Sequence, residues 1–213
     1  YSYATLSSEQ EPQVAAGSRW LNMRFEGKSI QRLIKAAKLP RWGKNRPSIM
    51  VWLAVDDLGE RHIIGDDSEH LAKLALQQGA MRRGLPLVYP VYDLEDSMQL
   101  PVEQLWGLFS DPILAASERY GAESVLAARL YKGPEGKWKG QWSFFFQAQE
   151  RNYVFESDTL DEQVLAGLSA AAQVLANKFA LKPTGLSGNH LDIEVSAVSS
   201  LRDYAMLTKY LEK

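Results

Sequence analysis

The chain has 213 residues, of which 46% are hydrophobic and 23% charged, proportions that are typical of a folded protein and exclude general disorder. The net charge of −2 gives no long-range attraction to nucleic acid or to an anionic membrane, and no uninterrupted apolar run approaches the ~20 residues that span a bilayer. Cysteine is absent, which excludes disulfides, thiolate metal sites and a cysteine nucleophile.

The amino-terminal part of the chain predicts two strands and a helix. Apolar and polar residues alternate in two stretches within residues 1–26, which is typical of an antiparallel pair joined by a long loop. Apolar residues at helical spacing then predict a helix over residues 29–39. Because two strands and one helix bury too little apolar surface to form a core of their own, we interpret residues 1–43 as the carboxy-terminal part of an α+β domain. The chain opens on Tyr1 rather than methionine, so we expect a processed form or a fragment.

The central part begins with a strand and a helix. Residues 48–55 are almost continuously apolar, which predicts a strand covered on both faces, and residues 62–64 predict a short edge strand after a turn. Asp67 or Ser68 is expected to cap the next helix, and Gly84 to end it. The predicted buried face of this helix consists of Leu71, Leu74, Ala75, Gln78 and Met81.

A second apolar strand is predicted at residues 86–92, followed by a helix at residues 101–109. Asp111 precedes a proline and is expected to cap a further helix, because the amide that proline lacks is unpaired in a first turn. Residues 123–147 predict a hairpin with its turn at residues 132–136, and residues 152–156 are predicted to extend it by a third strand. One face of its second strand is aromatic, and we expect it to form core. That face carries Trp138, Trp142, Phe144 and Phe146.

The carboxy-terminal part predicts a long helix, a strand and a last helix. Thr159 and Glu162 form a capping box for the long helix. A strand is predicted at residues 191–197, and Ser200 with Asp203 is expected to cap the last helix. The residues that the long helix is expected to bury are Val164, Leu165, Leu168, Ala172, Leu175 and Phe179.

The order β-α-β-α-α-β-β-β-α over residues 47–182 combines parallel crossovers with an antiparallel meander. This pattern predicts an α/β fold, a mixed-sheet α/β sandwich flanked by partial α+β pieces. We therefore place a central mixed α/β domain at residues 44–183. Residues 184–213 are interpreted as the start of a further α+β domain.

Three stretches resemble a known family: RPSIMVWLAVDD at 46–57, LPLVYPVYDLEDSMQL at 85–100 and DPILAASERYGAESVLAARL at 111–130. The tryptophan-rich GKWKGQWSFFF and the capped TLDEQVLAGLSAAAQVLANKFA follow in the order expected. Together they resemble an uncharacterised family of secreted gammaproteobacterial proteins, the domain of unknown function numbered two thousand and sixty-six. The resemblance implies an exported, periplasmic or envelope-located protein without its signal peptide, and it implies no activity. The architecture is also similar to the amino-terminal domain of TolB and to the curli-secretion lipoprotein, although fold analogy does not carry function.

Acidic residues follow both predicted apolar strands. Asp56 and Asp57 end the first, and Asp93 and Asp96 follow the second, so the acids are expected at one edge of the sheet, where α/β folds usually bind ligands. Four carboxylates there could hold Mg²⁺ or Ca²⁺ and serve a metal-dependent hydrolase. The simpler interpretation is that these acids form turns and cap helices.

A basic aromatic loop joins the first two predicted regions. Arg41, Trp42 and Arg46 could bind phosphate or stack on a base, which would indicate a nucleic-acid ligand. We favour instead an interdomain role, in which these side chains hold two domains together.

The residues present favour a protein that works by contact. No nucleophile–base–acid set is recognised, and His62 could act as a general base but is interpreted as a surface histidine. We expect no cofactor, no nucleic-acid partner and an envelope protein as the partner. The hypothesis is a non-enzymatic periplasmic interaction or scaffold protein, with the metal-dependent hydrolase as the alternative.

Overall fold

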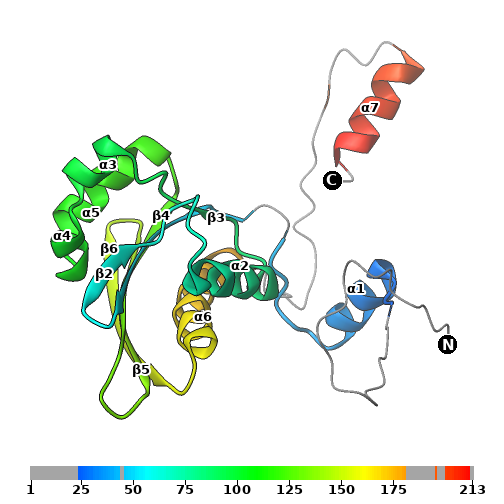
Figure 1. The fold of residues 1–213 in the computed structure, drawn as a ribbon. Coiled ribbons are helices and arrows are strands. Elements are labelled where there is room, and N and C mark those ends of the chain that lie inside the picture. Colours follow the sequence, from blue (N-terminus) through cyan, green and yellow to red (C-terminus); the bar gives the residue numbers. More distant parts are fainter. Residues whose placement is uncertain (1–23, 44–45, 181–194, 196–199, 212–213) are drawn as a thin grey trace, which may run out of the picture. The chain divides into compact units, whose positions relative to one another are not determined.

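We analysed a computed structural model of the chain, which describes residues 24–43, 46–180, 195 and 200–211. The chain divides into two compact units, Tyr1–Pro183 and Thr184–Lys213, and each is described by itself. The first unit contains a six-stranded sheet (Figure 1). Its strands are β1 (Ile49–Asp57), β2 (Glu60–Ile63), β3 (Leu87–Val88), β4 (Ser124–Lys132), β5 (Trp138–Phe146) and β6 (Gln149–Ser157).

The sheet has the order β2-β1-β4-β5-β6, with β3 paired to the start of β1. Strands β3 and β4 run parallel to β1, whereas β2, β5 and β6 each pair antiparallel to a neighbour. This topology confirms the predicted mixed-sheet α/β fold. The helices of this unit are α1 (Gly27–Ala36), α2 (Leu71–Arg83), α3 (Leu94–Gln99), α4 (Val102–Trp106), α5 (Ser110–Ser117), the 3₁₀ turn η1 (Glu118–Tyr120) and α6 (Leu160–Phe179).

Helices cover both faces of the sheet, α2 and α6 on one side and α3, α4 and α5 on the other (Figure 1). Residues of β1 alternate between the two cores: Val51 and Leu53 face α2 and α6, while Met50 and Trp52 face the other layer. A strand that is buried on both faces needs apolar residues at every position. The near-continuous apolar run of β1 is thereby explained, and its prediction is confirmed.

The hairpin and the long helix follow their predictions. Trp142 and Phe144 of β5 are buried beneath α6, and Trp138 and Phe146 pack against the same core. The Thr159 hydroxyl accepts from the Glu162 amide at 3.2 Å, and the Glu162 carboxylate accepts from the Thr159 amide at 3.3 Å, which confirms the capping box. Two residues of the predicted buried face are more open than expected: Leu165 is half-buried and Phe179 is 39% exposed.

The second apolar strand is much shorter than predicted. Only Leu87 and Val88 of residues 86–92 pair with β1, opposite Ile49 and Met50. Proline stands at positions 86 and 90, and it cannot donate to a ladder. Tyr92 then has a positive φ of 52°, so the chain turns away before it reaches the end of β1.

The prediction for the buried face of α2 was wrong for its three large apolar residues, although it correctly included Ala75, which is buried. Leu71, Leu74 and Met81 are 71%, 50% and 76% exposed, and the opposite, small-residue face is buried instead. A Cβ on Gly79 would lie 2.7 Å from Leu168 Cδ1, so only small residues allow α2 to approach α6 this closely. The residues that α2 buries are Ala72, Lys73, Ala75, Leu76, Gly79 and Ala80.

Two predicted helix caps were also wrong. The cap of α2 is His70, whose Nδ1 accepts from the Ala72 amide at 3.0 Å, rather than Asp67 or Ser68. Helix α5 begins at Ser110, so Asp111 lies inside its first turn. The Gly84 end of α2 is confirmed by its left-handed conformation, with φ 62° and ψ 43°.

The second unit contains helix α7 (Leu201–Leu211), capped by Ser200 and Asp203 as predicted. The strands predicted at residues 1–26 lie outside the described residues except for 24–26, and the strand at 191–197 does so except for Val195. Among the helices that the structure describes, none combines the length and the apolar character needed to cross a bilayer.

Candidate functional site

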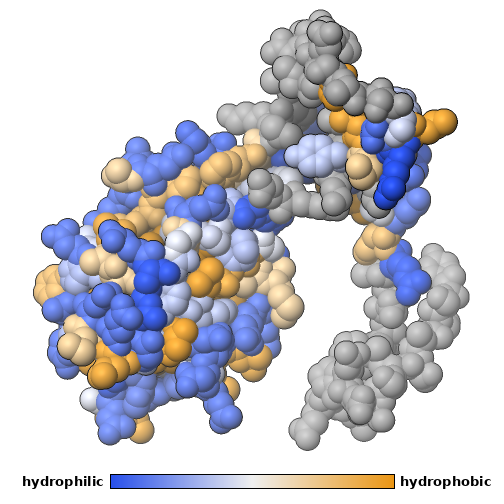
Figure 2. Space-filling view, turned by 90° about the horizontal axis from the view of Figure 1, so that it is seen from above, coloured by the Kyte–Doolittle hydropathy of each residue, from blue (hydrophilic) through white to orange (hydrophobic). Residues whose placement is uncertain are grey.

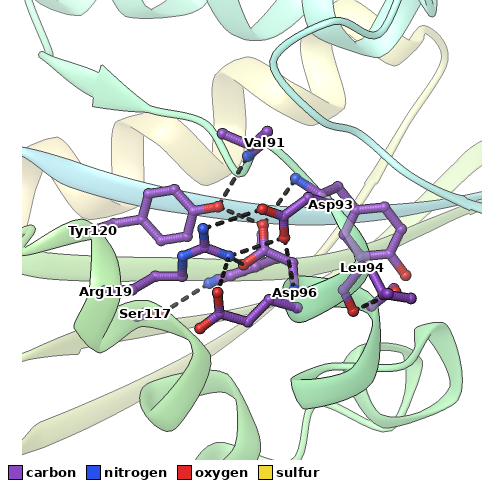
Figure 3. Close-up of polar contacts among 11 residues, drawn as sticks. Val91, Asp93, Leu94, Asp96, Ser117, Arg119 and Tyr120 are labelled. Atoms are coloured by element: carbon purple, nitrogen blue, oxygen red, sulfur yellow. Dashed lines mark hydrogen bonds and ion pairs between the residues drawn. The ribbon is translucent and has the colours of Figure 1, made fainter.

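A group of charged side chains that are paired with one another lies between α3 and the turn η1 (Figure 3). Asp93 caps α3, and its Oδ1 accepts from the Asp96 amide at 3.0 Å. Arg119 and Tyr120 form the end of η1, where they face these two carboxylates. We call Asp93, Asp96, Arg119 and Tyr120 the acidic clamp.

The carboxylate of Asp96 is the buried centre of the acidic clamp. Its side chain is fully buried, with 0% exposure. It accepts from the Tyr92 amide at 2.8 Å, from Arg119 Nη1 at 2.9 Å and from the Tyr120 hydroxyl. A buried carboxylate needs this degree of hydrogen bonding because its charge is removed from water. Its two oxygens are therefore both engaged in holding protein groups.

Arg119 closes the acidic clamp from the solvent side. Its Nη1 and Nη2 donate to Asp93 at 3.0 and 3.2 Å, a bidentate arrangement, and its Nη1 lies 3.6 Å from Glu95 Oε2. The guanidinium carbon also lies 5.4 Å from the centre of the Tyr120 ring. The cation thus faces three carboxylates, and its contacts fasten η1 to α3.

These contacts shift the pKa values of the acidic clamp. The hydrogen bond from Arg119 is the main cause that lowers the pKa of Asp93 to about 2, and the hydrogen bond to Asp93 raises the pKa of Arg119. Burial and then the hydrogen bond to Asp96 raise the pKa of Tyr120 to about 12. Near neutral pH the Tyr120 hydroxyl therefore keeps its proton and donates it to Asp96, while its oxygen accepts from the Val91 amide at 2.9 Å.

The other predicted acids, Asp56 and Asp57, stabilise the end of β1. Asp56 Oδ1 accepts from the Gly59 amide at 2.8 Å and so supports the turn to β2, and Arg61 Nε lies 3.7 Å from its second oxygen. Asp57 Oδ2 lies 2.7 Å from His70 Nε2. The four predicted acids therefore form two separate networks, and in the described part of the chain no group of three or more acids and histidines is arranged to hold a metal ion.

His70 is bonded at both ring nitrogens. Because Nδ1 accepts from a backbone amide, the proton must be on Nε2, which donates to Asp57. Neither nitrogen is free to take a proton from a substrate. A cavity of about 570 Å³ lies beside this pair, and His62 lines it with Asp57, His70 and Tyr92. The His62 side chain is 48% exposed, 3.8 Å from Glu60 Oε2.

The basic aromatic loop braces the carboxyl end of α2. Arg46 Nη1 donates to the carbonyl oxygens of Arg83 at 2.7 Å and Gly84 at 2.6 Å, and a cation at a helix carboxyl end is favoured by the dipole. Its guanidinium carbon lies 4.6 Å from the centre of the Trp42 ring, which packs on the core beneath α2 and α6. Arg41 is exposed.

The sequence interpretation missed Arg119, Tyr120 and His70. The sequence does contain a signal for Arg119, which is the one basic residue between Arg83 and Arg129. A buried carboxylate in this stretch has no other nearby cation in the chain to pair with. His70 gave no such signal, because its role depends on where the chain turns before α2.

Comparison with known protein families and with curated proteins finds no match. Among solved structures, a competence or damage-inducible protein from Enterobacter asburiae has 12% identity, covers 70% of this chain and 94% of its own, and gives a TM-score of 0.36. A competence-damaged protein (CinA) superfamily protein from Enterobacter cloacae has 12% identity, covers 74% of this chain and 99% of its own, and gives a TM-score of 0.36. A member of that superfamily from Escherichia coli has 14% identity, covers 73% of this chain and 94% of its own, and gives a TM-score of 0.34. We draw no functional conclusion from similarities this distant.

Proposed function

We propose that this chain works by contact, as a non-enzymatic interaction or scaffold module of the bacterial cell envelope. The observation that carries the proposal is the open edge of the sheet at β6. Strand β6 is the last in the strand order, and among the described residues it pairs with β5 alone. Nine residues of backbone therefore present an edge along which an extended segment of another protein can add as a strand.

The side chains of β6 suit such a contact. Val154, in the middle of the strand, is 72% exposed, while Tyr153 and Phe155 pack toward the core beneath α6. The strand is thus anchored on one face and open on the other and along its edge. An anchored strand loses little conformational freedom when a partner strand is added, which favours binding.

The charged groups of the candidate site also support a role by contact. The acidic clamp uses its carboxylates to hold η1 and α3 together, and Asp57 holds His70 at the start of α2. Each predicted acid thus has a local structural contact. The envelope location rests on the sequence resemblance given above.

The proposal is tested by photo-crosslinking in cells that produce the protein naturally. A photoreactive residue placed at Val154 is expected to yield one defined adduct in the periplasmic fraction. The matched control is Val91, also an exposed valine at 57%, which lies outside the strands. Equal adduct formation at both positions, or adducts confined to the cytoplasm, would contradict the proposal.

A further inference from the structure

The outer faces of α2 and α6 form a surface whose middle carries no charged side chains. The two helices pack against each other, and residues 74–81 and 163–177 contain no Asp, Glu, Lys or Arg. Leu71, Leu74 and Met81 are exposed there. The face of the molecule seen in Figure 2 is mainly hydrophilic, with apolar groups scattered over it. Depletion of charge with apolar side chains exposed is the compositional mark of an interface core.

Charges of opposite sign stand at the two ends of this surface. Both helices run opposite to β1, since α2 leads back to β3 and α6 returns from β6. Asp161 and Glu162 lie in the first turn of α6, and Arg82 and Arg83 lie in the last turn of α2. All four side chains are exposed. The surface is therefore acidic at one end, uncharged in the middle and basic at the other end.

We propose that this surface is the interface of a symmetric homodimer. A two-fold axis that lies in the interface and crosses the helices brings the uncharged centres together and places each acidic end against the basic end of the other copy. An isologous interface requires such self-complementarity. A lipid surface or a partner of a single charge would match one end of the surface and repel the other, which is why a second copy is the occupant we infer.

The size of the surface sets the expected strength of association. Two helices of 13 and 20 residues and ~10 Å diameter offer roughly 500 Å² per copy, about 1,000 Å² in total, which is the lower limit for specific interfaces. The dimer is therefore expected to dissociate on dilution. Sedimentation velocity over a concentration series of the full chain measures this directly.

The first test changes the uncharged centre. Leu74→Lys combined with Met81→Lys is expected to raise the dissociation constant by ~tenfold or more, because it buries two cations in the interface. The matched control is Leu94→Lys with Met98→Lys on α3, an exposed leucine and methionine at 77% and 74%, which should leave association unchanged. A wild-type chain that is monomeric at every concentration, or a dimer that the α2 variant leaves intact, overturns the proposal.

The second test exchanges the charges at the two ends and does not depend on the first variant folding. Asp161→Lys alone and Arg82→Glu alone should each weaken the dimer, because each places like charges together. The double variant should restore the wild-type dissociation constant to within ~threefold, since opposite charges then meet again. Failure of the double variant to restore association overturns the antiparallel arrangement, and circular dichroism confirms that each variant is folded.

Discussion

At the scale of single residues, the acidic clamp shows how a buried charge is accommodated. Asp96 has three donors around it, one from the backbone and two from η1. Replacing one carboxylate oxygen with an amide nitrogen removes the charge and leaves at least one of those donors without an acceptor. Breaking a buried ion pair by removing one partner is strongly destabilising. Stability is therefore expected to be more sensitive to this residue than to the exposed acids around it.

Asp96→Asn is predicted to lower the free energy of unfolding by about 2–4 kcal/mol, because the amide cannot satisfy all three donors. Urea denaturation followed by circular dichroism measures the change. Glu95→Gln is the control, since Glu95 lies on the same helix, is 60% exposed and lies 3.6 Å from the same arginine. An equal loss in both variants would contradict the central role of Asp96.

Asp93 is predicted to make the stability of the protein depend on pH in the acid range. Its pKa is lowered from 3.8 to about 2 in the folded state, so the stabilisation is complete above pH 3.8 and is lost as the pH falls from 3.8 to about 2. Asp93→Asn should therefore remove part of the acid-induced loss in melting temperature over that interval. Because Asp93 is exposed to solvent, high salt should reduce the difference between the variants. Identical pH profiles for both proteins would refute this assignment.

At the scale of secondary structure, small residues decide how the elements pack. Gly79 lets α2 approach Leu168, and Gly167 lets α6 lie on the ring of Trp142. These close approaches fix which face of each helix turns inward. The larger apolar residues of α2 are consequently left on the outside, where they form the centre of the inferred dimer interface.

Gly167→Ala is predicted to destabilise the first unit by about 1–3 kcal/mol in spite of the better helix propensity of alanine, because its Cβ would lie 2.4 Å from the Trp142 ring. The measurement is the urea midpoint of unfolding. Gly27→Ala in α1 serves as control, since a Cβ there meets nothing within 4 Å, and it should cause no loss.

Thr159→Ala is predicted to cost about 1 kcal/mol, because it removes the side-chain acceptor of the capping box of α6. Thermal denaturation should show a lower midpoint for this variant. Thr159→Ser retains the hydroxyl and should unfold close to the wild type, so an equal loss with serine would show that the methyl group rather than the cap is responsible.

At the scale of the whole molecule, the proposed role and its alternative differ in their response to divalent cations. A metal-dependent hydrolase built on Asp56, Asp57, Asp93 and Asp96 would gain about 2.7 kcal/mol of stability at a hundredfold excess of metal over its dissociation constant. We expect Mg²⁺, Mn²⁺ and Ca²⁺ to leave the melting temperature unchanged, in the wild type and in Asp56→Asn alike. A rise in the wild type that disappears in Asp56→Asn would support the hydrolase instead.

Features that depend on neighbouring residues could be predicted from the sequence. The capping box of Thr159 with Glu162 needs a separation of three residues, and the apolar run of β1 follows from burial on both faces. The aromatic face of β5 alternates with Lys139, Gln141 and Ser143 over most of the strand, which identifies it as core. These local patterns determined the α/β fold class and most elements of the first unit.

Only the tertiary structure decided which distant groups meet. Arg119 binds Asp93 and Asp96 across 26 and 23 residues of chain, and the face that α2 buries depends on Leu168, 89 residues beyond Gly79. Periodicity cannot choose between two apolar faces of one helix, because that choice depends on the shape of the surface it meets. The sequence alone thus determined most of the elements and their order, while close packing and charge pairing between remote segments decided the candidate site and the exposed interface.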